Sequence, residues 1–188
     1  MNAEIDRKIE RALAAEDWKA ARKHILRALQ DDPQDHWLLT NLATTYYEER
    51  DYRAALDWSR KALILAPQCP IVLWDYAGSL DMLGREKEAI EVWRGLIDWG
   101  AAAIAADECG EGIRAARSLV NDCRYRIGCA QVDLGHREAA TEMFEQYVAN
   151  RGRSTPSIYS LDDVHARLAQ LAKQPGAEPP RRARAVRS

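Results

Sequence analysis

Apolar residues recur along most of this chain at the three-and-four spacing of α-helices, and one segment shows the pattern clearly. From Trp37 to Glu49 the apolar positions lie on one helical stripe. They are Leu38, Leu39, Leu42, Ala43 and Tyr46. After Arg50-Asp51 a second stripe runs from Tyr52 to Leu65, and Pro67 then stops the helix. The segment predicts two helices joined by a tight turn.

The same pattern returns when the sequence is shifted against itself by about 34 residues, a period typical of helical repeat proteins. Ala21, Ala55 and Ala89 fall on one another, and Pro33 falls on Pro67. Three repeats result, at about 2–35, 36–69 and 70–103. A small residue where two helices cross lets their backbones approach closely. The recurring alanines therefore predict where the helices of each repeat cross.

The period then breaks, because a fourth repeat, at about 121–154, follows the third after 51 residues. Gly128 takes the place of Ala77, and Phe144 that of Trp93. The additional segment, 104–120, includes the acidic loop 107–112. The remainder lengthens the next helix, which we expect from Ile113 to Leu134, with a length of about 33 Å at ~1.5 Å per residue.

The last part of the sequence predicts a helix followed by a basic tail. Ser160 to Asp163 resembles a helix start, and Val164, Leu168 and Leu171 follow at helical spacing. We therefore expect a helix over 161–173 that caps the stack. Residues 174–188 are rich in Pro, Arg and Ala without periodicity, and we expect them to be disordered.

The second repeat carries the residues of a known signature: a small residue and an aromatic in the first helix, aromatic-x-x-Ala in the second, and a closing proline. They are Ala43, Tyr46, Tyr52, Ala55, Ala62 and Pro67. In these positions the chain resembles the tetratricopeptide repeat, although Arg50 and Ser59 depart from it. The resemblance implies an all-α fold over residues 2–172: a right-handed α-α superhelix of about four helical hairpins with a C-terminal capping helix.

The resemblance also implies that the first helix of each hairpin lines a concave groove that holds a peptide or a helix of another protein. The positions of this surface are Trp37, Thr40, Asn41, Thr44 and Tyr47 in the second repeat, Trp74, Asp75 and Gly78 in the third, and Asp122, Tyr125 and Arg126 in the fourth. Exposed aromatic residues often anchor protein interfaces. The alternative for Trp37 and Trp74 is packing against an adjacent repeat or the long helix.

Charge and composition narrow the classes of partner. The net charge is −2, but from Lys173 onward five basic residues face one acidic residue, so residues 1–172 carry −6. A basic body would suggest nucleic acid as a partner, and this mildly acidic one does not, so we expect no nucleic acid. The N-terminus lacks the pattern of a secretory signal, and no apolar stretch is long enough to span a membrane. We therefore expect a cytoplasmic protein with reduced thiols, and 21 arginines against 6 lysines hint at a bacterial source.

The sequence shows no signature of a catalytic site or of a metal-binding site. The sequence contains no glycine-rich phosphate loop, no Gly-x-Ser-x-Gly and no Cys-x-x-Cys. The best group of potential metal ligands is Cys109, Cys123, Cys129 and His136. On one helix, Cys123 and Cys129 would point about 120° apart. Cys129 and His136 would lie about 10 Å apart, too far for one zinc ion. We expect no cofactor, no metal and no enzymatic activity.

The sequence thus favours a non-catalytic scaffold or adaptor that binds a partner protein in the groove. The alternative is a self-associating regulatory or chaperone-like domain that forms a homodimer. The long helix and the capping end would supply its dimer surface. Arg114, Arg117 and Arg124 form a basic stripe on the long helix that could pair with acidic residues of a neighbouring repeat or of a second copy. The least favoured hypothesis is that the chain is an enzyme or a metal-binding protein.

Overall fold

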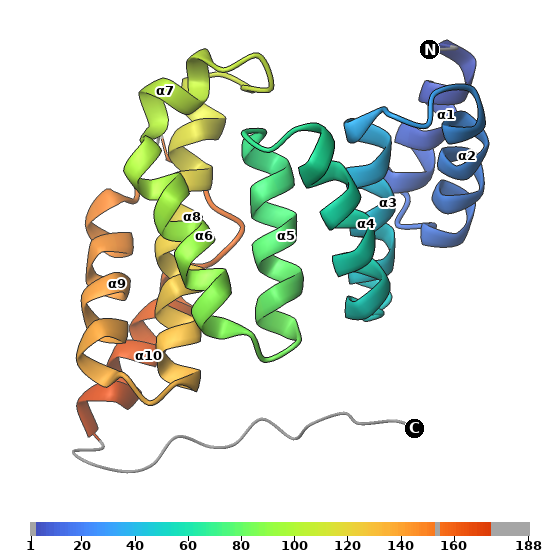
Figure 1. Ribbon diagram of the computed structural model, residues 1–188. Helices are drawn as coiled ribbons and strands as arrows, with labels where there is room; N and C mark the ends of the chain where they lie inside the picture. Colours follow the sequence, from blue (N-terminus) through green and yellow to red (C-terminus); the bar gives the residue numbers. More distant parts are fainter. Residues whose placement is uncertain (1–2, 153–154, 174–188) are drawn as a thin grey trace, which may run out of the picture. The chain divides into compact units, whose positions relative to one another are not determined.

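The computed structural model describes residues 3–152 and 155–173, and over these residues the chain folds into α-helices (Figure 1). They are α1 (Ala3–Ala14), α2 (Trp18–Asp31), α3 (His36–Glu48), α4 (Tyr52–Leu65), α5 (Pro70–Met82), α6 (Glu86–Trp99), α7 (Ala101–Ala106), α8 (Ile113–Asp133), α9 (Arg137–Asn150) and α10 (Leu161–Lys173). The all-α fold class predicted from the sequence is confirmed. The expectation of disorder for 174–188 lies outside the described residues.

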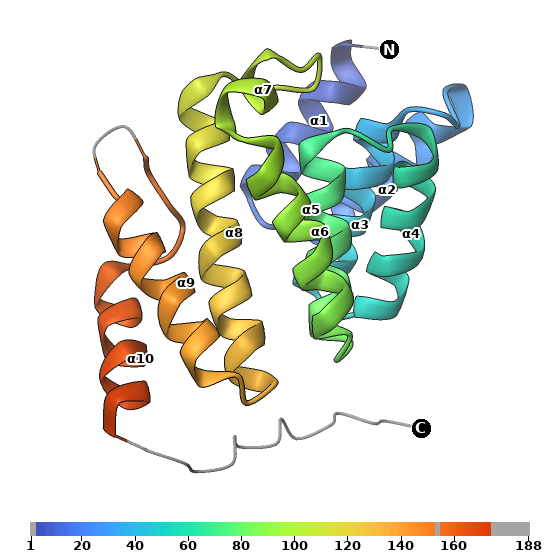
Figure 2. The ribbon, with the colours of Figure 1, turned by 60° about the vertical axis from the view of Figure 1, so that its left-hand side comes forward.

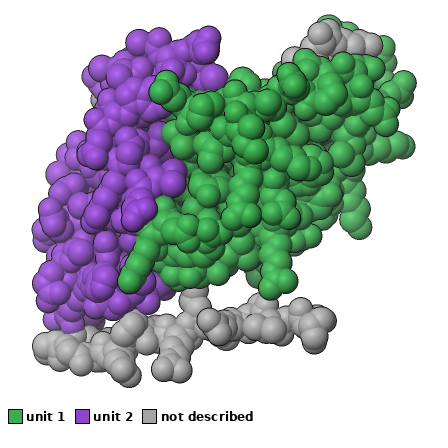
Figure 3. Space-filling model, viewed as in Figure 1, with its two compact units in different colours: residues 1–89 green, residues 90–188 purple. Residues whose placement is uncertain are grey.

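The chain divides into two compact units, coloured green and purple in Figure 3. Unit 1 comprises residues 1–89, which include α1 to α5 and the first residues of α6. Unit 2 comprises residues 90–188, which include the rest of α6 and α7 to α10. Each unit has its own hydrophobic core and is described by itself below.

A repeated backbone turn closes the first helix of each hairpin. Glu16, Arg50 and Gly84 have positive φ angles of 55°, 65° and 75°, and Gly135, at the equivalent position of the fourth repeat, has 78°. After each of them, the next backbone N–H bonds to the carbonyl five residues before it, at 2.9–3.0 Å. This is the left-handed C-cap that favours glycine. The period seen in the sequence is therefore a period of turn geometry, which Glu16 and Arg50 adopt without being glycine.

Aspartate side chains fix the starts of three successive helices in unit 1. Asp17, Asp35 and Asp51 accept hydrogen bonds at 3.0–3.1 Å from the backbone N–H three residues later, at the start of α2, α3 and α4. Each carboxylate satisfies an N–H that has no partner within the helix. Asp17 and Asp51 occupy the same position in successive repeats, so this cap is part of the repeat.

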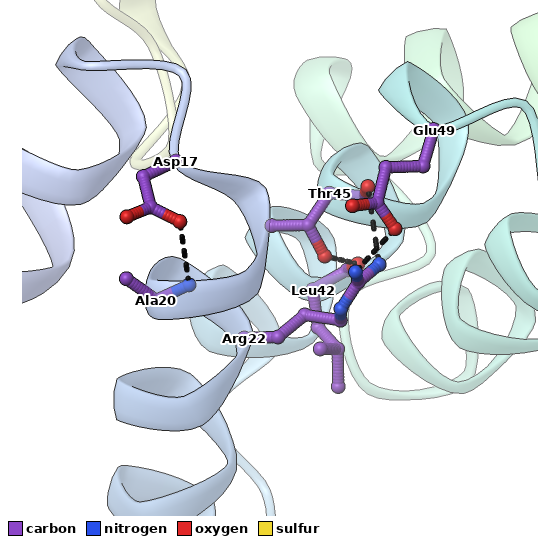
Figure 4. A network of polar contacts seen from close by, with 6 residues as sticks. All are labelled: Asp17, Ala20, Arg22, Leu42, Thr45 and Glu49. Atoms are coloured by element: carbon purple, nitrogen blue, oxygen red, sulfur yellow. Dashed lines mark hydrogen bonds and ion pairs between the residues drawn. The ribbon is translucent and has the colours of Figure 1, made fainter.

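The core of unit 1 joins neighbouring hairpins. Its buried residues come from α1, α2 and α3: Ile9, Ala12, Ala21, Ile25, Ala28, Leu38 and Leu42. A polar contact reinforces this packing, because Arg22 of α2 forms an ion pair with Glu49 at the end of α3 (Figure 4). The same guanidinium donates to the carbonyl of Thr45 at 3.4 Å and lies 4.5 Å from the centre of the Tyr46 ring.

Unit 2 departs from the regular repeat at α7 and α8. Gly100, with a φ of 83°, ends the run of α6 and begins the short helix α7, which the sequence pattern did not reveal. The acidic loop follows, and α8 then runs for 21 residues. The predicted long helix is thus present, and it lies beside α9 (Figure 2).

The crossing of α8 and α9 explains a glycine in the middle of a helix. Gly128 is buried, and a Cβ atom at this position would lie 2.6 Å from Cε1 of Phe144, whose ring is fully buried. Across the chain, Ala21, Ala55, Ala89 and Ala140 are also fully buried. The small residues that defined the repeat therefore lie in the interior, as expected for close helix crossings.

Candidate protein-binding surfaces

Polar side chains of α3 form the first part of the predicted surface in unit 1. Thr40, Asn41 and Thr44 each bond to the carbonyl four residues earlier in α3, at 2.7, 2.9 and 3.1 Å. Such bonds satisfy the side-chain donors within the helix itself. Trp37, at the start of the same helix, keeps 38% of its surface exposed. Thr40 is buried, whereas Asn41 and Thr44 are half-buried.

Helix α5 supplies the other part, and one hydrogen bond joins the two helices. The Thr44 hydroxyl lies 2.8 Å from Oδ2 of Asp75. Trp74 and Asp75 are half-buried, and Gly78 is buried. We call the surface made by Trp37, Thr40, Asn41, Thr44 and Tyr47 of α3 together with Trp74, Asp75 and Gly78 of α5 the α3–α5 face. The Thr44–Asp75 contact therefore joins one predicted residue of the second repeat to one of the third.

The carboxyl group of Asp75 has an altered acidity. Burial raises its pKa to about 7, and the nearby charge of Glu48 acts in the same direction. The hydrogen bond from Thr44 opposes this shift, because it stabilises the ionised form. Asp75 thus titrates near neutral pH, and a cation that approached it would favour its ionised form.

Tyr47 lies at the far end of α3 and contacts the next helix. Its ring meets the ring of Tyr52, at the start of α4, edge-on with 5.3 Å between the centroids. Part of its surface therefore serves the turn between α3 and α4.

In unit 2, two of the corresponding positions of the fourth repeat, Asp122 and Tyr125, are covered by other residues of the chain. Asp122 is 4% exposed and Tyr125 is 7% exposed. The Tyr125 ring stacks on the Tyr159 ring, with 3.8 Å between centroids, and its hydroxyl donates to Asp163 at 2.6 Å. The Ser157 hydroxyl donates to the Asp122 carboxylate. Residues 155–163, which we call the C-terminal strap, thus occupy the surface where a partner was expected.

Helix α9 holds the C-terminal strap in place. The hydroxyl of Tyr147 lies 2.7 Å from both Ser157 Oγ and the carbonyl oxygen of Tyr159. Arg151 donates to the carbonyl of Thr155 at 2.9 Å. These contacts join the strap to α9 by side chains that are themselves fixed in the unit 2 core, where Tyr147 is fully buried.

The burial of Asp122 also changes its acidity. Desolvation raises the pKa of this carboxyl to about 6, against the hydrogen bonds from Ser157 and the backbone of Ile158. The sequence predicted the helix over 161–173, which carries Asp163, but not the packing of Thr155 to Tyr159, because these residues of the strap show no periodicity. The aromatic at Tyr159 and the hydroxyl at Ser157 were the available signals.

The remaining candidates in unit 2 lie on α8. Arg126 is half-buried, with its guanidinium 5.1 Å from the centre of the Trp93 ring of α6. Cys123 is fully buried, and desolvation raises the pKa of its thiol, so the reactive thiolate is disfavoured. His136 Nδ1 lies 2.7 Å from the side-chain oxygen of Gln131. These contacts describe packing and capping groups.

Comparison with known proteins supports the repeat assignment. Residues 122–151 match the tetratricopeptide repeat model. No curated protein sequence matches the chain. The resemblance to the tetratricopeptide repeat is thus confirmed in the repeat that follows the insertion.

Solved structures share the fold at low sequence identity. A crystal structure of MamA protein has a TM-score of 0.60 at 14% identity and covers 90% of this chain and 86% of its own. MamA residues 41-end from Desulfovibrio magneticus RS-1 give 0.63 at 16%, with 92% of each chain covered. A tetratricopeptide repeat protein from Parabacteroides merdae ATCC 43184 gives 0.50 at 16%, with 90% and 72% covered. At these identities the likeness establishes the fold.

The helices were also compared with the requirements of a membrane span. None of those in residues 3–152 and 155–173 combines the length and the apolar character needed to cross a bilayer.

Proposed function

We propose that this tetratricopeptide-like protein is a non-catalytic adaptor that binds a segment of another protein on the α3–α5 face of unit 1. The fold is one that serves protein–protein interaction. The observation that carries the proposal is the exposure of Trp37 beside polar groups already satisfied within their own helix. A large aromatic side chain left in water at 38% exposure gains free energy when a partner covers it.

The polar residues of the face support an orienting role. Asn41 uses its amide donor on a carbonyl of its own helix, which leaves its side-chain oxygen as an acceptor for a ligand N–H. Asp75 can accept a cationic group. Micromolar binding requires only about −8 kcal/mol, within the range of an aromatic anchor and a few hydrogen bonds.

The difference between the two units reduces the set of residues that we propose for partner binding. Asp122 and Tyr125 contact the C-terminal strap, so their surface is not available to a partner while the strap is bound. We therefore assign binding to Trp37, Asn41, Thr44, Trp74 and Asp75, with Thr40, Tyr47 and Gly78 shaping the face.

The experiment is affinity capture from the source cells with the full chain, followed by mass spectrometry. The wild-type protein is compared with Trp37→Ala combined with Asn41→Ala. The matched control is Ile158→Ala, which removes a side chain that is 78% exposed in unit 2. Circular dichroism reports whether each variant keeps its helices.

The adaptor proposal expects a specific partner that the double variant loses and the control keeps, with the helical signal unchanged in both. Equal capture by all three proteins would contradict the assignment to the α3–α5 face. Turnover of a substrate by the purified chain would contradict the non-catalytic role.

Self-association is the second candidate, and one observation favours it. Ile113, Arg114 and Arg117, at the start of α8, are all exposed, which provides an apolar residue beside a basic pair. A second copy could bury this end of α8. Light scattering at high protein concentration measures the mass directly: a mass of two chains that falls to one in Ile113→Asp supports it, and one chain throughout excludes it.

A further inference from the structure

A second surface of unit 1 lies on the opposite set of helices, between α2 and α4. It is a pocket of about 390 Å³ whose residues all belong to unit 1. The lining residues are Leu26 and Leu29 of α2, Pro33 and Gln34 of the following turn, Leu39 of α3, and Trp58, Lys61, Ile64 and Leu65 of α4. We call this the α2–α4 pocket.

The floor of the pocket is continuous with the core of unit 1. Leu29 and Trp58 pack against the buried cluster that includes Ile25 and Leu38. The pocket is thus a recess in which the side of the core reaches the surface. A recess of this kind accepts protruding side chains of a partner, whereas a flat surface cannot enter it.

The rim of the pocket gathers exposed apolar side chains. Among the described residues seven large hydrophobic side chains are exposed, and three of them, Leu26, Ile64 and Leu65, belong to this one pocket. Ile64 is 80% exposed. Single exposed apolar residues are ordinary on protein surfaces, but a cluster around a recess is typical of an interaction site.

The charge of the two helices is opposite to that of the chain as a whole. Together α2 and α4 carry seven basic residues against two acidic ones, a net charge of +5, while the whole chain carries −2. The basic residues are Lys19, Arg22, Lys23, Arg27, Arg53, Arg60 and Lys61, and the acidic ones are Asp31 and Asp57. The first helices α1, α3 and α5 together carry −3. Arg22 is paired with Glu49 and Arg60 with Asp57, whereas Lys23 and Lys61, each one helical turn from an apolar residue of the pocket, are exposed.

One of these cations lies in the pocket wall itself. The ammonium of Lys61 stands 3.6 Å from the centre of the Trp58 ring. On α4, Lys61 is one helical turn from both Ile64 and Leu65. On α2, Lys23 stands one turn before Leu26. Apolar contacts and positive charge are thus interleaved on both helices that border the pocket.

We propose that the α2–α4 pocket docks an acidic amphipathic segment of a partner protein, bound as a helix along the groove between α2 and α4. Apolar side chains of that segment enter the recess at helical i, i+3 and i+4 spacing. Its carboxylates meet Lys61 and Lys23 at the rim. The chain's own C-terminal residues, with four arginines among 174–188, carry the wrong charge for this rim. This site is separate from the α3–α5 face and does not depend on its function.

The test uses the full chain and a synthetic fluorescent peptide with leucine at i, i+3, i+4 and i+7 and glutamate at the other positions. A matched peptide has lysine in place of every glutamate. Fluorescence anisotropy measures binding to the wild type, to Ile64→Asp and to Lys61→Glu. Because Ile64 and Lys61 are exposed, neither substitution disturbs the core. The control variant is Ile158→Asp, which places the same charge on an exposed isoleucine of unit 2.

The acidic peptide is expected to bind saturably, and the lysine peptide is not. Ile64→Asp and Lys61→Glu should each weaken binding by about tenfold, because each puts a negative charge where the peptide brings its own. Ile158→Asp and Trp37→Ala should leave it unchanged. Raising the salt concentration should weaken the wild-type complex.

Equal binding of the two peptides, an unchanged affinity in Ile64→Asp, or the absence of saturation up to about 1 mM, a concentration at which even weak complexes form, would overturn the proposal. Vesicles of phosphatidylcholine with phosphatidylglycerol provide the competing case. If they bind the wild type but not Ile64→Asp while the acidic peptide does not bind, the surface recognises an anionic membrane and the protein-segment proposal is wrong.

Discussion

The second repeat in unit 1 and the fourth repeat in unit 2 use equivalent positions in opposite ways. In unit 1, Trp37 of α3 keeps 38% of its surface exposed, whereas Asp122, at the equivalent position of the fourth repeat, keeps 4%. In unit 2, Asp122 and Tyr125 of α8 are satisfied by the C-terminal strap. The same helical hairpin therefore leaves an aromatic residue exposed in one place and forms an internal contact in another.

This difference shows that the repeat pattern predicts where a surface lies but not what covers it. The signature residues, such as Ala55 and Ala140, occupy the interior in both units. The surface residues are free to differ. What decides the role of the surface is a segment from elsewhere in the chain, and in unit 2 that segment follows the last repeat.

The largest expected effect comes from removing the aromatic ring of the strap. Tyr159→Ala should destabilise unit 2 by about 2–3 kcal/mol, because the stacked ring at 3.8 Å from Tyr125 is lost and Tyr125 becomes exposed. Chemical denaturation followed by circular dichroism measures it. Ile158→Ala, at the neighbouring exposed position, should change stability by less than about 0.5 kcal/mol. Equal effects would mean that the strap does not pack on α8.

The next effect distinguishes two glycines in helices. Gly128→Ala should destabilise the protein by about 1–2 kcal/mol, because the new methyl group meets the buried Phe144 ring and this overpacking exceeds the gain in helix propensity. Gly95→Ala in α6 should stabilise by about 1 kcal/mol, because nothing lies within 4 Å of the added carbon. Thermal unfolding of both variants decides it, and the same sign for both would contradict the close crossing of α8 and α9.

A smaller effect compares the turns of the repeats. Arg50→Gly should stabilise unit 1 by about 0.5–1 kcal/mol, since an exposed arginine holds a φ of 65° that glycine adopts without strain. Gly84→Ala, at the equivalent turn with a φ of 75°, should cost about 1 kcal/mol. Denaturation midpoints of the two variants test this. If Arg50→Gly is less stable than the wild type, the turn is not under strain.

The last comparison concerns the titration of two desolvated carboxyl groups, one in each unit. Asp75 in unit 1 should show a pKa of about 7 and Asp122 in unit 2 a pKa of about 6. Both values exceed that of an unfolded aspartate. The stability gained from the neutral form is therefore fully present below about pH 4 and is lost as the pH rises through these values.

Carbon-13 NMR of the carboxyl groups measures both titrations. Asp75→Asn and Asp122→Asn assign the signals, and each variant should lack the corresponding fall in stability with rising pH. Normal pKa values at both positions would mean that neither carboxyl group is as buried as the structure indicates.

The sequence predicted the parts of the fold that repeat. Laying each repeat over the next located the helix crossings at Ala21 and Ala55, and the later break located the long helix α8. Rules about neighbouring residues were enough to predict these parts, because a helix cap such as Asp51 and a turn such as that at Arg50 depend on residues close by in the sequence. The short helix α7 was not predicted, because Gly100 and the run of alanines after it are compatible with a loop as well as with a helix.

The binding surfaces could be predicted from the sequence less completely than the fold. The residues of the α3–α5 face could be placed by position in the repeat, since the two helices that carry Thr44 and Asp75 are equivalent. The covering of Tyr125 by Tyr159 could not, because the two residues lie far apart in the sequence and the strap has no periodic pattern. The α2–α4 pocket could not be predicted from the sequence, because residues of three helices form it. Leu26 and Ile64 line the same pocket only in the folded structure.

The most direct test of the difference between the units places a photo-crosslinking residue at Asn41 in one protein and at Arg126, the equivalent position of the fourth repeat, in another. Both are exposed to light in the source cells, and adducts are identified by mass spectrometry. The account predicts covalent adducts with a partner protein from position 41 and only intramolecular products from position 126. Partner adducts from position 126 with none from position 41 would contradict it.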